Sequence, residues 1–172
     1  LRRLDEISAD SASVANELRR ADDVLKQVFF DVNGQGPTEW SSATREAVTA
    51  LAAIHLNYGN GGFADIESLL KTSLNGLPEP SNEWQVAANS LLVGIIARQP
   101  GREGDASEML KQVGDASMSQ LLDLFRQIAE IVESANGPAR HDLAKIVIDI
   151  AGRLDSKRAD LGETQSLSID RG

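Results

Sequence analysis

The sequence predicts an all-α fold of about seven helices. Along most of the chain, apolar residues recur at steps of three and four, which is the period of an amphipathic helix. No segment keeps up the strict alternation of apolar and polar residues that marks a half-buried strand. Each cluster of Gly, Pro and Asn falls between two helical patterns, where it is expected to form a turn.

The first helix is expected within residues 1–32. Its apolar residues follow a single stripe, made of Leu4, Ile7, Val14, Leu18, Ala21, Leu25, Val28 and Val32. The breaker cluster at 33–37 ends it. The spacing also fits a coiled-coil partner over about four heptads, so this helix either packs on the rest of the chain or dimerises.

A first helix pair is expected over residues 38–78. Thr38 is the predicted N-cap of its long helix, with Trp40 in the first turn. The glycines at 59–62 are interpreted as an ordinary turn into a shorter helix. A phosphate-binding loop is less favoured because no strand precedes these glycines and no lysine follows closely.

A second helix pair is expected over residues 82–114. Ser81 or Asn82 is the predicted cap of its long helix, whose wide apolar face predicts burial on more than one side. A terminal pair is expected over 117–156. Residues 157–172 are expected to be a polar tail or the start of a further repeat.

The two helix pairs resemble each other in sequence. The segment 61–71 recurs forty residues later as 101–111, with Gly, Asp, Leu and Lys at matching positions. Upstream, Glu39-Trp40 recurs as Glu83-Trp84. The pattern predicts one helical-repeat domain over 1–156.

The repeated segments resemble the tetratricopeptide repeat family. The matching residues of the first unit are Gly61, Phe63, Ile66, Leu70, Ser73, Leu74 and Pro78, and those of the second are Gly94, Ala97, Gly101, Ala106 and Leu110. The chain departs from the family at Ile54 and Glu103, and its unit length is nearer forty than thirty-four, so HEAT-like hairpins stay open. The resemblance implies antiparallel helical hairpins stacked as a short α-α superhelix.

The same resemblance implies a partner-binding groove. Family members contact partners through the inner face of the first helix of each pair, which here carries His55 and Tyr58 in one unit. In the next unit it carries Arg98 and Gln99. The alternative is that these four residues are the solvated ends of helices.

The residue inventory does not favour catalysis. The chain has two histidines and no cysteine, without the spacing of a zinc or di-iron motif. We therefore expect no enzymatic activity, metal or cofactor. A net charge of −9 and only 2 Trp, 1 Tyr and 4 Phe disfavour nucleic-acid binding, and no apolar run is long enough for a membrane span.

The function that follows is a protein-interaction or assembly scaffold with a protein or peptide partner. Because the chain does not begin with Met and an apolar pattern restarts near 167–169, we expect a fragment of a larger protein. One alternative is a structural helical bundle that docks on its parent chain or homodimerises through helix 4–32. Another is an accessory ligand-binding domain of an enzyme. The sequence leaves the cellular compartment open.

Overall fold

The computed structural model describes residues 2–30, 37, 39–59, 61–75 and 83–169, and only the backbone of 2–11 and 161–169. All its regular structure in these ranges is helical, as predicted, and seven helices are present. The chain divides into two compact units, residues 1–78 and 79–172. The single domain expected over 1–156 stays a prediction.

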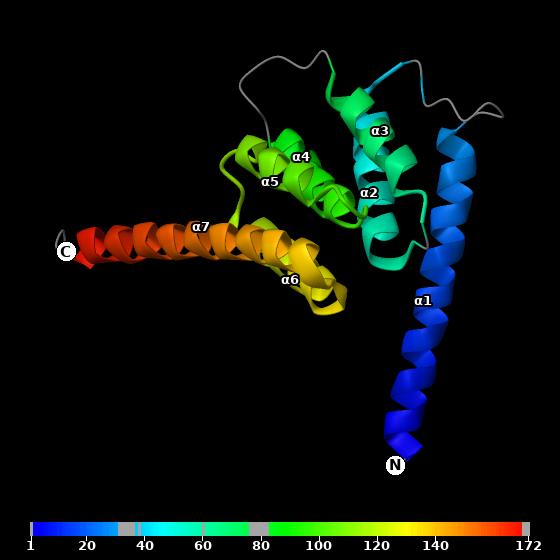
Figure 1. Cartoon of the computed structure of the whole chain (residues 1–172), viewed down its shortest axis with the longest axis horizontal. Coiled ribbons are helices and arrows are strands. Elements are labelled where there is room, and N and C mark those ends of the chain that lie inside the picture. The colour runs from blue at the N-terminus through cyan, green and yellow to red at the C-terminus, as the bar shows by residue number, and fades with distance from the viewer. Residues whose placement is uncertain (1, 31–36, 38, 60, 76–82, 170–172) are drawn as a thin grey trace. The chain divides into compact units, whose positions relative to one another are not determined.

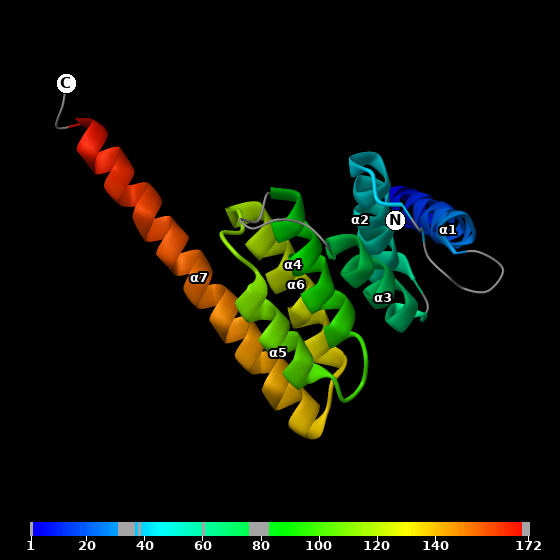
Figure 2. The same ribbon diagram turned by 90° about the horizontal axis from the view of Figure 1, so that it is seen from above.

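The first unit contains three helices, of which the second packs against both others (Figure 2). They are α1 (Arg2–Phe29), α2 (Ser42–Tyr58) and α3 (Phe63–Leu74). Its core is formed by apolar side chains of α2 and α3, namely Val48, Leu51, Ala52, Leu56, Ile66, Leu69 and Leu70. In addition, Arg45 Nε donates a hydrogen bond to the Ser73 carbonyl at 2.9 Å and ties α2 to the end of α3.

The second unit contains two helical hairpins (Figure 1). They are formed by α4 (Glu83–Ala97) with α5 (Glu103–Gln112), and by α6 (Met118–Ser134) with α7 (Gly137–Ile169). In addition, α4 packs on α6 and α5 packs on α7. Each hairpin therefore covers one side of the other.

The helix α4 is buried on more than one side, as its wide apolar face predicted. Val86, Ala88, Leu92, Val93, Ile95 and Ile96 are all buried along it. They point around most of the helix, because successive residues turn by about 100°. Only a helix enclosed by several neighbours buries such a set, and α4 contacts both α5 and α6.

The beginnings of the helices follow capping chemistry. Ser41, and not the predicted Thr38, is the N-cap of α2, because its hydroxyl accepts a hydrogen bond from the Thr44 amide at 3.1 Å. Trp40 consequently precedes the helix. Ser117 and Gln120 form a reciprocal capping box at the start of α6. The predicted caps Ser81 and Asn82 lie outside the described residues.

The last helix is longer than its apolar pattern indicates. The pattern weakens after residue 154, yet α7 continues to Ile169. Two contacts fasten its middle to the loop after α5: Arg153 Nη1 donates to the Val113 carbonyl at 3.1 Å, and Lys157 Nζ lies 2.5 Å from Asp115 Oδ1. The sequence predicted a polar tail or the start of a further repeat after residue 156. In the structure, residues 157–169 continue α7 as a helix.

Candidate functional site

A cluster of buried polar side chains lies at the contact between α1 and α2. His55 of α2 and Asp22 of α1 are 0% and 2% exposed. His55 Nδ1 is 2.8 Å from Asp22 Oδ1 and 3.0 Å from Oδ2. Because a carboxylate only accepts hydrogen bonds, the donor in this contact is the Nδ1–H group of His55 and the acceptor is Asp22. The pair joins two helices that are distant in sequence.

Lys26 completes the environment of the buried carboxylate. It lies one turn after Asp22 on α1, and its Nζ is 3.2 Å from Asp22 Oδ2. The lysine side chain is 27% exposed, so its ammonium group connects the buried pair with the surface. Buried charges are tolerated where they are paired and hydrogen-bonded, and Asp22 meets both conditions.

The other ring nitrogen of His55 is in a different situation. His55 Nε2 is buried and has no hydrogen-bond partner among the described residues. The ring packs at a tilt against the Phe63 ring, with 4.8 Å between their centroids. The imidazole therefore has an aromatic neighbour in Phe63 as well as its hydrogen bond to Asp22.

Gly59 fits closely against the same histidine. A Cβ at this position would lie 2.3 Å from His55 Nδ1, a distance that non-bonded atoms do not reach. The Gly59 amide also donates to the His55 carbonyl at 2.8 Å and ends α2. Nearby, Gly62 adopts a positive φ of 71° as the N-cap of α3, a conformation that glycine adopts without strain.

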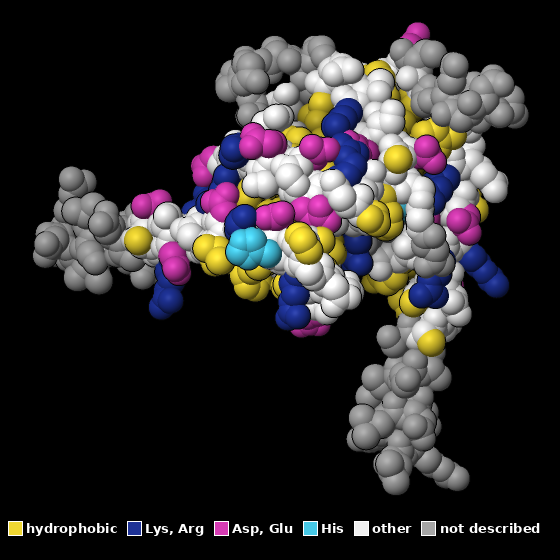
Figure 3. Space-filling model, viewed as in Figure 1, with side chains coloured by type: hydrophobic (Ala, Val, Ile, Leu, Met, Phe, Trp, Pro, Cys, Tyr) yellow, Lys and Arg dark blue, Asp and Glu magenta, His cyan; other side chains and the backbone are white. Residues whose placement is uncertain are grey.

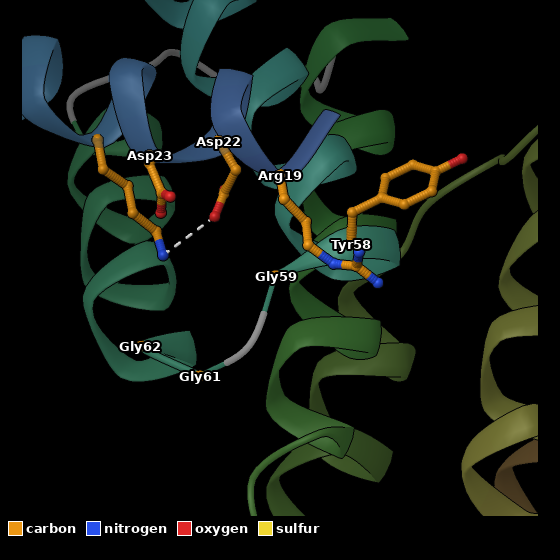
Figure 4. Close-up of a pocket in the computed structure, with 8 residues that line it drawn as sticks. Arg19, Asp22, Asp23, Tyr58, Gly59, Gly61 and Gly62 are labelled. Atoms are coloured by element: carbon orange, nitrogen blue, oxygen red, sulfur yellow. Dashed lines mark ion pairs between the residues drawn. The ribbon is translucent and has the colours of Figure 1, made fainter. Parts of the chain in front are cut away.

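A pocket of about 340 Å³ lies between α1 and these glycines. Figure 4 shows charged side chains of α1 on one side of it and the α2–α3 turn on the other. Its lining contains both signs of charge, from Arg19, Lys26, Asp22 and Asp23, and is completed by Tyr58, Gly59, Gly61 and Gly62. Such a lining offers hydrogen-bond donors and acceptors to a small polar molecule.

The predicted groove residues fall in both units. Tyr58 lines the pocket, whereas His55 is buried and contacts Asp22 of α1. Arg98 and Gln99 follow α4 in the second unit: Arg98 Nη2 lies 3.7 Å from Glu130 Oε2, and Gln99 Nε2 donates to the Ile95 carbonyl at 3.4 Å. A groove formed by all four residues stays a prediction.

Sequence reasoning missed Asp22, Lys26 and Arg19. The apolar stripe predicted for the first helix includes Ala21 and Leu25 but not Asp22, which lies between them in the sequence. A pattern was available, because Asp22 and Lys26 are spaced i, i+4 as helical ion pairs are. That pattern does not indicate burial, since most such pairs are solvated.

In the described part of the chain, no three His, Cys, Asp or Glu side chains are grouped so that they would hold a metal ion. None of the helices described there combines the length and the apolar character that crossing a membrane requires.

Comparison with known proteins found no matching family model, no matching curated protein and no matching solved structure.

Proposed function

We propose that this chain is a non-catalytic protein-interaction or assembly scaffold. The observation that supports this proposal is the exposure of large apolar side chains on both helices of the α6–α7 hairpin, which we take together as its open apolar surface. Leu122 of α6 is 52% exposed and Ile148 of α7 is 70% exposed. Apolar groups gathered on a surface of a folded protein mark sites where another protein binds.

Half-buried apolar residues extend this surface on both helices. They are Met118, Phe125, Ala129 and Val132 on α6, and Ala144, Val147, Ala151 and Leu154 on α7. Figure 3 shows hydrophobic side chains among charged ones over the second unit. A charged rim around an apolar centre is the usual composition of a protein-binding surface.

The packing within the second unit supports a finer proposal, a short tetratricopeptide-like α-α superhelix. In such an array each hairpin covers one side of the next, first helix on first helix and second on second. The contacts of α4 with α6 and of α5 with α7 follow this scheme. The open side of α6–α7 would then receive a helical segment of a protein or peptide partner.

The test is a binding measurement with a purified partner, identified by cross-linking in cells that contain the protein. We expect Leu122→Glu to weaken binding in calorimetric titration, because it places a charge in the apolar centre. Gln112→Glu adds the same charge at an exposed position of α5 and serves as the control. Equal binding by wild type and Leu122→Glu would show that this surface is not used.

A second candidate function rests on the first helix. Val14, Val24 and Val28 on α1 are 54%, 58% and 72% exposed, and they lie along one side of the helix. We propose as the alternative that α1 docks on a parent chain or on a second α1. Light scattering on the full chain tests the dimer. If α1 mediates dimerisation, the combined substitutions Val24→Asp and Val28→Asp are expected to halve the measured mass. A monomeric wild type would contradict dimerisation through α1.

A further inference from the structure

The direction of the open apolar surface on α7 follows from one contact in the second unit. The hydrogen bond from Arg153 to Val113 marks the side of α7 that faces α5 and its loop. At about 100° per residue, Ile148 lies about 140° around α7 from Arg153, and so points away from α5.

The residues that share this side of α7 form a symmetric sequence. Between residues 140 and 155 they are, in order, Arg140, Ala144, Val147, Ile148, Ala151 and Asp155, at steps of four, three, one, three and four. The pattern is a palindrome about the midpoint between Val147 and Ile148. It has branched apolar residues at the centre, alanines on both sides, and opposite charges at the two ends.

The charges at the ends are available for a partner. Arg140 and Asp155 are both exposed. Within the described part of the chain neither forms an ion pair, unlike the nearby Asp142–Lys145 and Asp149–Arg153 pairs on the same helix. A palindrome with opposite charges at its ends is complementary to an antiparallel copy of itself.

We propose that α7 pairs antiparallel with α7 of a second copy of this chain, across a twofold axis between Val147 and Ile148. In this arrangement Arg140 of each copy meets Asp155 of the other, and Val147 meets Ile148. Ala144 and Ala151 face each other, and their small side chains allow the close helix spacing that such packing requires. The single interface is formed by the same patch on both copies, as a closed twofold dimer requires.

The apolar centre and the charged ends have different roles in this dimer. Exposed ion pairs contribute at most about 1 kcal/mol each, so the apolar centre supplies the affinity. The charges select the antiparallel orientation, since a parallel pair would place like charges together. This inference rests on the proposed scaffold function and names a second copy as a partner of its open surface.

The first experiment measures the mass of the full chain by sedimentation equilibrium. At about 100 µM, where an interface with a micromolar Kd is largely occupied, we expect twice the 18.5 kDa of one chain. Ile148→Asp is expected to weaken self-association by at least about tenfold, with unchanged helicity because the side chain is exposed. Ser156→Asp, on another side of α7, adds the same charge and is expected to leave the dimer intact.

The second experiment tests the orientation by charge reversal. Arg140→Asp and Asp155→Arg each place like charges together and are expected to weaken the homodimer. An equimolar mixture of the two variants is expected to form a heterodimer, because every end-to-end contact is again between opposite charges. A mixture no more dimeric than either variant alone would overturn the antiparallel pairing.

Failure of this inference is separable from failure of the scaffold function. A monomeric wild type at about 100 µM overturns the pairing through α7. So does a dimer that is lost when Val24→Asp and Val28→Asp are combined but is kept in Ile148→Asp. The scaffold function is then judged by the partner titration with Leu122→Glu, which does not depend on self-association.

Discussion

His55 Nδ1 lies 2.8 Å from Asp22 Oδ1, and the two side chains are almost completely shielded from solvent between α2 and α1. A buried donor and a buried acceptor that satisfy each other contribute little net free energy, but either one alone is costly. The stability of the contact between these helices therefore depends on both partners being present.

Asp22→Ala is expected to lower the free energy of unfolding by about 2–3 kcal/mol, because it leaves the His55 ring buried without its acceptor. Urea denaturation of the full chain measures this. Asp23→Ala, at the exposed neighbouring position, is the control and is expected to stay within about 0.5 kcal/mol of wild type. In a double-mutant cycle with His55→Leu, strict additivity of the two losses would contradict the pairing.

Gly59→Ala is expected to destabilise the protein by about 1–3 kcal/mol, since the new methyl group would collide with the His55 ring. The backbone at Gly59 has φ −71° and ψ 150°, which alanine adopts freely, so the contact alone accounts for the cost. Thermal unfolding monitored by circular dichroism measures the effect.

The matched control for that substitution is Gly152→Ala. Gly152 lies inside α7, where an added Cβ would meet nothing within 4 Å, and alanine there is expected to stabilise the helix by about 0.5–1 kcal/mol. The cost of Gly59→Ala is expected to fall in a His55→Ala background. An undiminished cost would show that the histidine is not the obstacle.

Ser117→Ala is expected to lower the free energy of unfolding by about 1 kcal/mol. The substitution removes the hydroxyl that accepts a hydrogen bond from the Gln120 amide at the start of α6. Ser156→Ala, in the exposed middle of α7, is the control with the same loss of a hydroxyl and is expected to have a small effect. Guanidinium unfolding compares the two, and equal effects would argue against a capping role for Ser117.

Asp142 is expected to titrate below the ordinary range of an aspartate. The hydrogen bond from Lys145 and its positive charge lower the pKa of Asp142 from 3.8. A carboxyl whose pKa is lower in the folded state favours folding above pH 3.8, and this contribution is lost as the pH falls through the lowered pKa. NMR titration measures the shift, and Lys145→Met is expected to return the pKa toward 3.8. A value unchanged by Lys145→Met would exclude the lysine as the cause.

Local patterns in the sequence were sufficient to predict seven helices, although not the N-cap of α2 or the full length of α7. The stripe from Met118 through Leu121 and Ile128 repeats at helical spacing and becomes α6. The breaker clusters at 57–62 and 99–101 separate helices as expected. These features depend on neighbours within one or two turns, which a single sequence displays directly.

The candidate site could not be predicted in the same way, because its contacts are not local. Asp22 and His55 are 33 positions apart, and a polar residue on an apolar stripe gives no indication of its partner. The pocket at the glycines after α2 was missed for the same reason. No lysine follows these glycines closely in the sequence, so a charged site was not predicted there. The structure brings Lys26 of α1 to the same pocket as these glycines.

The buried Asp22–His55 pair has a consequence for the alignment of α1 along α2. Apolar stripes alone permit two helices to slide past each other by a turn, about 5.4 Å, at little cost. Such a shift would bring Leu18 or Lys26 opposite His55, and neither offers the ring an acceptor. The pair therefore fixes the register of α1, a role that buried polar groups are known to fill in helical assemblies.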